Sequence, residues 1–168
     1  DPMFLSGLIQ EAVVVEKHAE AIPWMKQYLG LVETPDDLTA AIPLAMKVVG
    51  GLEDPDTFQT QLLETGHRSV AETCLLAELL QKRGEFRQSD EILDAYGSEN
   101  TLALSQKARL LQLREDFEAA AQVLEQLVAL PNGRTGTQIE RLVRLHSQAL
   151  QPEQALHWID EWKRVSPG

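Results

Sequence analysis

The sequence predicts an all-α protein, a solenoid of about five antiparallel helix hairpins stacked as a single domain over residues 1–168. Composition supports this, because Leu, Ala, Glu and Gln favour helices and are abundant, whereas aromatic residues make up only 5% of the chain. A repeated sequence segment also supports this prediction. The stretch LLQLREDFEAAAQVLEQLVALPN at 110–132 follows the same order as LLQKRGEFRQSDEIL, which begins 31 residues earlier. Paired helices with a period of 31–35 residues are typical of helical solenoids.

Four helices are expected in the first 68 residues. Apolar residues at helical spacing place the first three at 4–16, 21–29 and 38–49. Pro43 falls inside the third of these, where it should kink the helix or delay its start. Asp54-Pro55 pairs an N-cap residue with a first-turn proline, so we expect a fourth helix that reaches about residue 64.

Six further helices are expected in residues 69–168. Ser69 and Glu72 have the spacing of a capping box, and Gly84 and Gly97 stand where helices should end in a left-handed residue. These signals, with the breaks at Pro131 and Pro152, place the helices at 69–83, 86–96, 101–114, 117–130, 137–149 and 152–165. The residues expected inside are Leu76, Leu80, Leu111, Leu124, Leu142 and Ile159.

The helices group into pairs of similar length. The expected repeats are 4–34, 37–66, 70–98, 101–132 and 136–168. Small residues fall at equivalent places of the second helices, namely Ala21, Ser89, Ala120 and Ala155. A small side chain at this place lets two helices approach closely. Because one hairpin cannot bury its apolar face alone, stacked neighbours should complete the core.

The stretch REDFEAAAQVLEQLVALPN resembles the tetratricopeptide repeat family in its order of turn, aromatic, small residues and closing proline. The resemblance covers residues 70–168 well and 4–66 loosely, and the family's early Trp is missing from every repeat. It implies a right-handed superhelix whose first helices line a concave groove. Members of this family generally bind peptides or other proteins and have no catalytic activity. The resemblance therefore implies neither a cofactor nor a metal.

Carrying over the family's groove-facing positions gives a set of polar residues. They are Gln81, Lys82, Gln106, Arg109, Gln112, Arg141, Arg144 and Gln148. Such a groove is locally basic and suits an acidic segment or carboxylate, because Arg presents a planar fork to these groups. The alternative is an ordinary solvated helix face. The family's chaperone-tail clamp of Lys, Asn and Arg is missing, because the corresponding positions hold Cys74, Glu78, Ser105 and Gln106.

Charge and cysteine content narrow the class of partner. The net charge of −11 disfavours nucleic acid, which needs a clustered positive field. The acidic excess lies in residues 1–100, whereas 101–168 hold 8 Lys/Arg and 8 Asp/Glu. No apolar run reaches the ~18 residues of a membrane-spanning helix. Cys74 is the only cysteine, which fits a reducing compartment such as the cytoplasm and does not exclude the bacterial periplasm.

Other candidate sites have simpler interpretations. His146 replaces a packed aromatic of the family, so we expect it in or near the core. His157, Asp160 and Glu161 share a helix but lack the His-Glu-x-x-His pattern of a metal site. The loop PNGRTG at 131–136 follows a helix and lacks the ending of a phosphate-binding loop, so we interpret it as an inter-repeat loop.

Trp158 and Trp162 are one turn apart on the last expected helix, so both can lie on one side of it. Solenoids usually end in a polar capping helix, and none follows in this sequence. We therefore expect this end to contact another copy or a continuation of the protein. The alternative is that both rings cover the last hairpin.

Two classes of function follow. The first is a non-catalytic scaffold that binds a peptide or protein partner. The chain begins at Asp1-Pro2, and we expect it to be a piece of a larger bacterial protein. The second is a self-association module without a peptide ligand, for example in envelope or polysaccharide-secretion machinery. An enzyme would need a pocket with converging titratable groups, which the sequence does not show.

Overall fold

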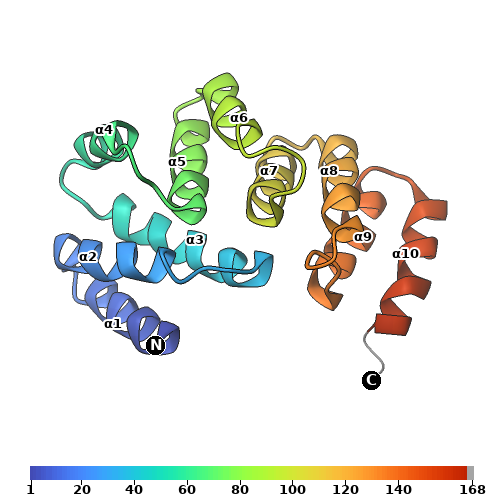
Figure 1. The fold of residues 1–168 in the computed structure, drawn as a ribbon, viewed down its shortest axis with the longest axis horizontal. Coiled ribbons are helices and arrows are strands. Elements are labelled where there is room, and N and C mark those ends of the chain that lie inside the picture. The colour runs from blue at the N-terminus through green and yellow to red at the C-terminus, as the bar shows by residue number, and fades with distance from the viewer. Residues whose placement is uncertain (166–168) are drawn as a thin grey trace. The chain divides into compact units, whose positions relative to one another are not determined.

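The computed structural model describes residues 1–165, and that range folds into ten α-helices without a strand (Figure 1). The prediction of an all-α protein is therefore confirmed. The helices are α1 (Pro2–Val14), α2 (His18–Leu29), α3 (Pro35–Gly50), α4 (Pro55–Glu64), α5 (Val70–Lys82), α6 (Phe86–Asp94), α7 (Thr101–Leu113), α8 (Phe117–Ala129), α9 (Gly136–Gln148) and α10 (Pro152–Val165). Their ends lie within a few residues of those expected from the sequence.

The chain forms two compact units, one from Asp1 to Ile92 and one that begins at Leu93. In the first unit, α2 packs on α1 and α3, while α5 packs on α3 and α4. In the second unit, α8 packs on α7 and α9, and α10 packs on α9. Each unit buries its own apolar residues. The single-domain arrangement expected from the sequence stays a prediction.

Helix α3 begins earlier than the sequence suggested. Thr34 Oγ1 accepts a hydrogen bond from the Asp37 amide at 3.1 Å, and the Asp37 carboxylate accepts one from the Thr34 amide at 3.1 Å. This capping box and Pro35 in the first turn start the helix three residues before the expected position. Pro43 lies inside the helix, which continues to Gly50 because its apolar face is buried. Of the two effects expected of Pro43, the delayed start was wrong, and the kink stays a prediction.

One turn recurs between four pairs of helices. In each, a residue with positive φ follows the first helix, and the next amide donates to the carbonyl five residues back. The positive-φ residues are Glu16, Gly84, Glu115 and Leu150. The closing bonds run from Lys17 to Ala12, Glu85 to Leu80, Asp116 to Leu111 and Gln151 to His146, all at 2.8–3.0 Å. This is a Schellman ending. Gly51, between α3 and α4, has a φ of −97° and lacks it.

Small side chains follow each of these turns at the same distance. Ala21, Ser89, Ala120 and Ala155 each lie five residues after the positive-φ residue, and all four are buried. The Ser89 hydroxyl donates to the Ala77 carbonyl at 2.8 Å, so α6 approaches the backbone of α5 closely. A larger side chain would separate these two helices.

The six residues expected in the core divide into two groups. Leu76, Leu80, Leu124 and Leu142 are fully buried, as expected. Leu111 and Ile159 are only half-buried. On α7 the deepest residues are Ala108 and Leu110, which leaves Leu111 at the edge of the core cluster. On α10 only Ala155 is buried, so Ile159 lies at the margin of the second unit.

Candidate partner-binding surface

Arg141 connects two helices of the second unit. Its Nη1 atom donates to the Ser105 hydroxyl of α7 at 3.1 Å and to the Gln138 side-chain oxygen of α9 at 2.8 Å. Ser105 and Gln138 are buried. These bonds hold one guanidinium group over the boundary between α7 and α9, two helices whose contacting residues are 36 positions apart in the chain.

Two further arginines lie close to this contact. Arg109 is four residues after Ser105, and Arg144 is three residues after Arg141. Residues three or four apart share a helix face. Arg109 is therefore about one turn, or about 5.4 Å, from Ser105 along α7, and Arg144 is about one turn from Arg141 along α9. Arg144 is exposed and pairs with Glu140 of its own helix at 2.8 Å. We call the faces of α7 and α9 that carry Arg109, Arg141 and Arg144 the arginine face.

The other residues expected in the groove have different surroundings. Gln112 is half-buried and Gln148 is exposed, both in the second unit. Gln81 is half-buried and Lys82 is exposed, both in the first unit on α5. Gln106 is only 1% exposed, because the first two turns of α7 are buried almost all round. Its side chain has no surface to offer a partner, so the prediction for this residue was wrong.

The four residues that the resemblance assigned to clamp positions are buried as well. Cys74, Glu78, Ser105 and Gln106 all lie in the interior. Burial raises the pKa of the Cys74 thiol, and the negative charge of Glu78 raises it further. The thiol therefore stays protonated and is a poor nucleophile or metal ligand.

His146 has a structural role, as the sequence indicated. It is buried, and its Nδ1 lies 2.8 Å from the Gln151 side-chain oxygen. Its Nε2 lies 3.1 Å from a carboxylate oxygen of Glu125 on α8. Both ring nitrogens are therefore engaged, and the ring ties α9 to α8 and to the turn before α10.

The acidic residues of α10 pair with neighbouring cations. Asp160 pairs with Lys163, and Glu161 pairs with Arg164 and with Arg134 from the loop before α9. The nearby His157 ring lies edge-on to the Trp158 ring, with 5.4 Å between centroids. Within residues 1–165, no three His, Cys, Asp or Glu side chains are grouped so as to hold a metal ion.

The two tryptophans of α10 differ in their surroundings. Trp158 is half-buried and packs against the core cluster of the second unit. Trp162 is 39% exposed, and Leu156 and Val165 on the same helix are exposed too. Of the two rings, Trp162 is the one that a partner could cover.

Sequence reasoning missed two features. The supporting bonds of Arg141 depend on Ser105 and Gln138, which lie in the buried parts of their helices. A cavity in the first unit was also missed; the acidic excess of residues 1–100 indicated only the charge of its lining. Among the described helices, none is both long and apolar enough to cross a membrane.

Comparison with protein-family models and with curated proteins found no match.

Proposed function

We propose that this chain is a non-catalytic protein-binding scaffold that holds an acidic segment of a partner on the arginine face. The observation that carries the proposal is the Arg141 bridge between α7 and α9. It fixes one guanidinium group. The proposal is supported by the helical register, in which Arg144 is one turn from Arg141 and Arg109 is one turn from Ser105. Arginine binds carboxylates through paired N–H groups, so this face suits Asp and Glu side chains.

We also infer that the helix pairs are degenerate tetratricopeptide-like hairpins of a solenoid. The recurring Schellman turn supports this inference, because its positive-φ residues are 68, 31 and 35 residues apart, and 68 is two periods of 34. The buried small residue five positions later repeats with the same spacing. The pair α3 and α4 lacks both features, so it is the most divergent.

The proposal can be tested with a fluorescein-labelled peptide of alternating Glu and Ser, compared with one that carries Gln in place of Glu. We expect the wild-type protein to bind the Glu peptide, and binding to weaken as salt rises, since exposed charges are screened over about 10 Å at 0.1 M. The double variant Arg109→Glu/Arg144→Glu should bind at least about tenfold more weakly, because it places like charges opposite the peptide.

A matched control distinguishes an effect of the arginine face from an effect of the protein's net charge. Arg87→Glu/Lys163→Glu makes the same change in charge at two exposed residues, on α6 and α10. It should leave the affinity for the Glu peptide within about twofold of the wild type, since rim and remote charges contribute little. Equal affinity for the peptide in the wild type and the Arg109→Glu/Arg144→Glu variant would remove the arginine face from consideration.

A second candidate function is self-association through α10. The observation in its favour is the exposed apolar surface of Trp162 and of Val165, which is three residues further on and shares its helix face. Tryptophan is a frequent anchor of protein interfaces. In this function the chain is a structural assembly module, and the partner is a second copy.

A further inference from the structure

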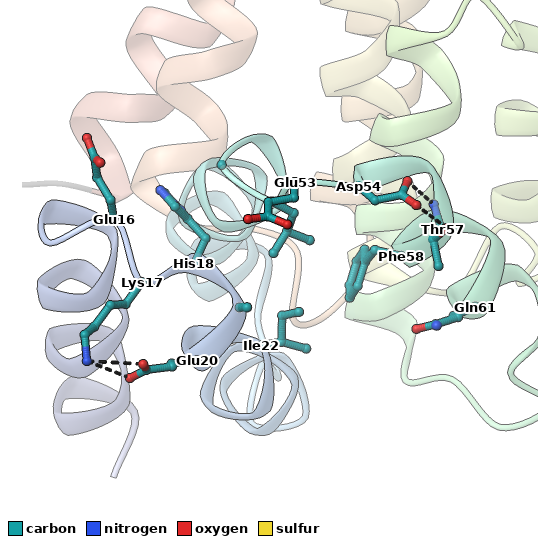
Figure 2. A pocket seen from close by; sticks show the side chains of 13 residues that line it. Glu16, Lys17, His18, Glu20, Ile22, Glu53, Asp54, Thr57, Phe58 and Gln61 are labelled. Atoms are coloured by element: carbon teal, nitrogen blue, oxygen red, sulfur yellow. Dashed lines mark hydrogen bonds and ion pairs between the residues drawn. The ribbon is translucent and has the colours of Figure 1, made fainter.

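The first unit contains a cavity that the proposed function does not use. Its volume is about 490 Å³, and it lies between the start of α2, the loop from α3 to α4, and α4 itself (Figure 2). Ile22 from α2 and Phe58 from α4 face the space from opposite sides, and Leu52 of the loop completes the apolar lining. The interior of this cavity therefore suits an apolar chain.

The polar lining of the cavity is acidic. It includes four carboxylates, Glu16, Glu20, Glu53 and Asp54, and one ammonium group, Lys17. Lys17 is already paired with Glu20 at 3.2 Å. Glu16 and Glu53 form no ion pair within residues 1–165 and so remain unneutralised. The whole first unit has the same bias, with 16 Asp/Glu and 7 Lys/Arg in residues 1–92.

Asp54 keeps its charge at neutral pH. It caps α4 by accepting a hydrogen bond from the Thr57 amide at 3.0 Å, and the Thr57 hydroxyl donates to it as well. The hydroxyl bond and the amide bond hold the pKa of Asp54 below its ordinary value. A fixed negative charge therefore remains at the α4 side of the cavity.

His18 brings an unsatisfied polar atom to the cavity lining. Its Nδ1 is shielded from water and has no hydrogen-bond partner within the described residues. The ring lies against Gly51, where an added Cβ would come within 2.2–2.3 Å of three ring atoms. A glycine at position 51 is thus required for the ring to lie there.

A second cation of the chain, Lys26, lies beside the apolar lining of the cavity. Its ammonium nitrogen lies 6.0 Å from the centroid of the Phe58 ring. A cation at about this distance over an aromatic face is stabilised by the ring's quadrupole. Phe58 thus has a cation beside its ring and also belongs to the apolar lining of the cavity.

From these observations we propose that the cavity binds an alkylammonium or guanidinium group on an apolar stem. The stem packs against Ile22, Leu52 and Phe58, while Glu16, Glu53 and Asp54 neutralise the charge. A lysine or arginine side chain of a partner and a free aliphatic amine share this chemistry. The site lies wholly within the first unit, so it does not depend on the arginine face.

The test is a titration of ¹⁵N-labelled protein with 1,5-diaminopentane, followed by amide chemical shifts. We expect shifts confined to residues 16–22 and 51–61, and weaker binding at high salt. The variant Glu16→Gln/Glu53→Gln keeps the shape of the lining but removes two charges. It should lower the affinity about threefold or more, because it removes two exposed carboxylates that face the same cation.

The matched control is Glu11→Gln/Glu64→Gln, which removes two exposed carboxylates outside the cavity. It should change the affinity less than about twofold. Equal loss in both variants would show a general charge effect and overturn the proposal. Absence of shifts in residues 16–22 and 51–61 would overturn it as well.

A second arm identifies the source of the cation. An acetylated hexapeptide with a single Lys is titrated under the same conditions. Binding at least about tenfold tighter than the diamine assigns the cavity to a partner's side chain, since the flanking peptide adds contacts. Weaker peptide binding with the diamine shifts retained assigns it to a free amine. The same peptide with acetylated Lys should not bind.

Discussion

At the scale of single residues, burial decides which leucines stabilise the second unit. Leu124 of α8 is fully buried in the core cluster, whereas Leu111 of α7 packs only against its edge. We expect Leu124→Ala to lower the free energy of unfolding by about 2–5 kcal/mol, the range for buried leucines. Leu111→Ala should cost less, about 1 kcal/mol, because less of its surface is removed from water.

The measurement is urea denaturation followed by circular dichroism, with Leu113→Ala as control. Leu113 is exposed on α7, the helix that also carries Leu111. Leu113→Ala should therefore lower the free energy of unfolding by no more than about 0.5 kcal/mol. A loss at Leu124 no larger than at Leu113 would place α8 in the wrong register. Strand content in the spectrum of the folded protein would contradict the all-α fold itself.

At the scale of elements, the cap of α4 should respond to pH. The pKa of Asp54 is lowered from its ordinary 3.8, mainly by the Thr57 hydroxyl. The stabilising contribution is therefore present above pH 3.8 and is lost as pH falls through the lower, folded-state value. In an NMR titration the Thr57 amide should shift with a midpoint below 3.8. Asp54→Asn should remove this titration, and a midpoint above 3.8 would contradict the cap.

The recurring turn gives a second prediction at this scale. Leu150 has a φ of 57° and is 87% exposed, so its side chain gains little in return for the strained backbone. Leu150→Gly should raise the free energy of unfolding by about 0.5–1 kcal/mol, because glycine adopts positive φ without a Cβ penalty.

Gly84 offers the opposite change in the same kind of turn. Its φ is 79°, and an added Cβ would meet no atom within 4 Å. Gly84→Ala therefore tests backbone strain alone and should destabilise by about 1 kcal/mol. Thermal unfolding of Leu150→Gly and of Gly84→Ala tests both predictions. A destabilised Leu150→Gly protein would mean that the Leu150 side chain stabilises the turn after all.

At the scale of the whole molecule, the sequence predicted helices better than surfaces. Caps and helix-breaking residues are local, so Asp54 and Ser69 marked the starts of α4 and α5 correctly. Thr34 was missed because its capping partner is Asp rather than the usual Glu or Gln. The burial of Gln106 depends on residues far away in the chain, which a single helix pattern does not contain.

The cavity was beyond sequence reasoning for the same reason. Its walls come from residues 16–22 and 51–61, whose separation in the chain gives no hint of their proximity. Likewise, the contact between Ser105 and Arg141 depends on how α7 and α9 pack. What the sequence did contain was the position of Arg109, Arg141 and Arg144 in their helices, and that was enough to nominate the arginine face for testing.

Self-association through α10 is a property of the whole molecule that can be tested. If a second copy covers Trp162 and Val165, sedimentation should show a mass that rises with protein concentration. Fully burying a large ring stabilises by about 2–3 kcal/mol, and 39% of Trp162 remains to be buried, so Trp162→Ala should weaken association about fivefold or more. Leu150→Ala changes an exposed apolar residue outside α10 and should leave association unchanged. A monomer across the whole concentration range would mean that the exposed side of α10 does not bind a second copy.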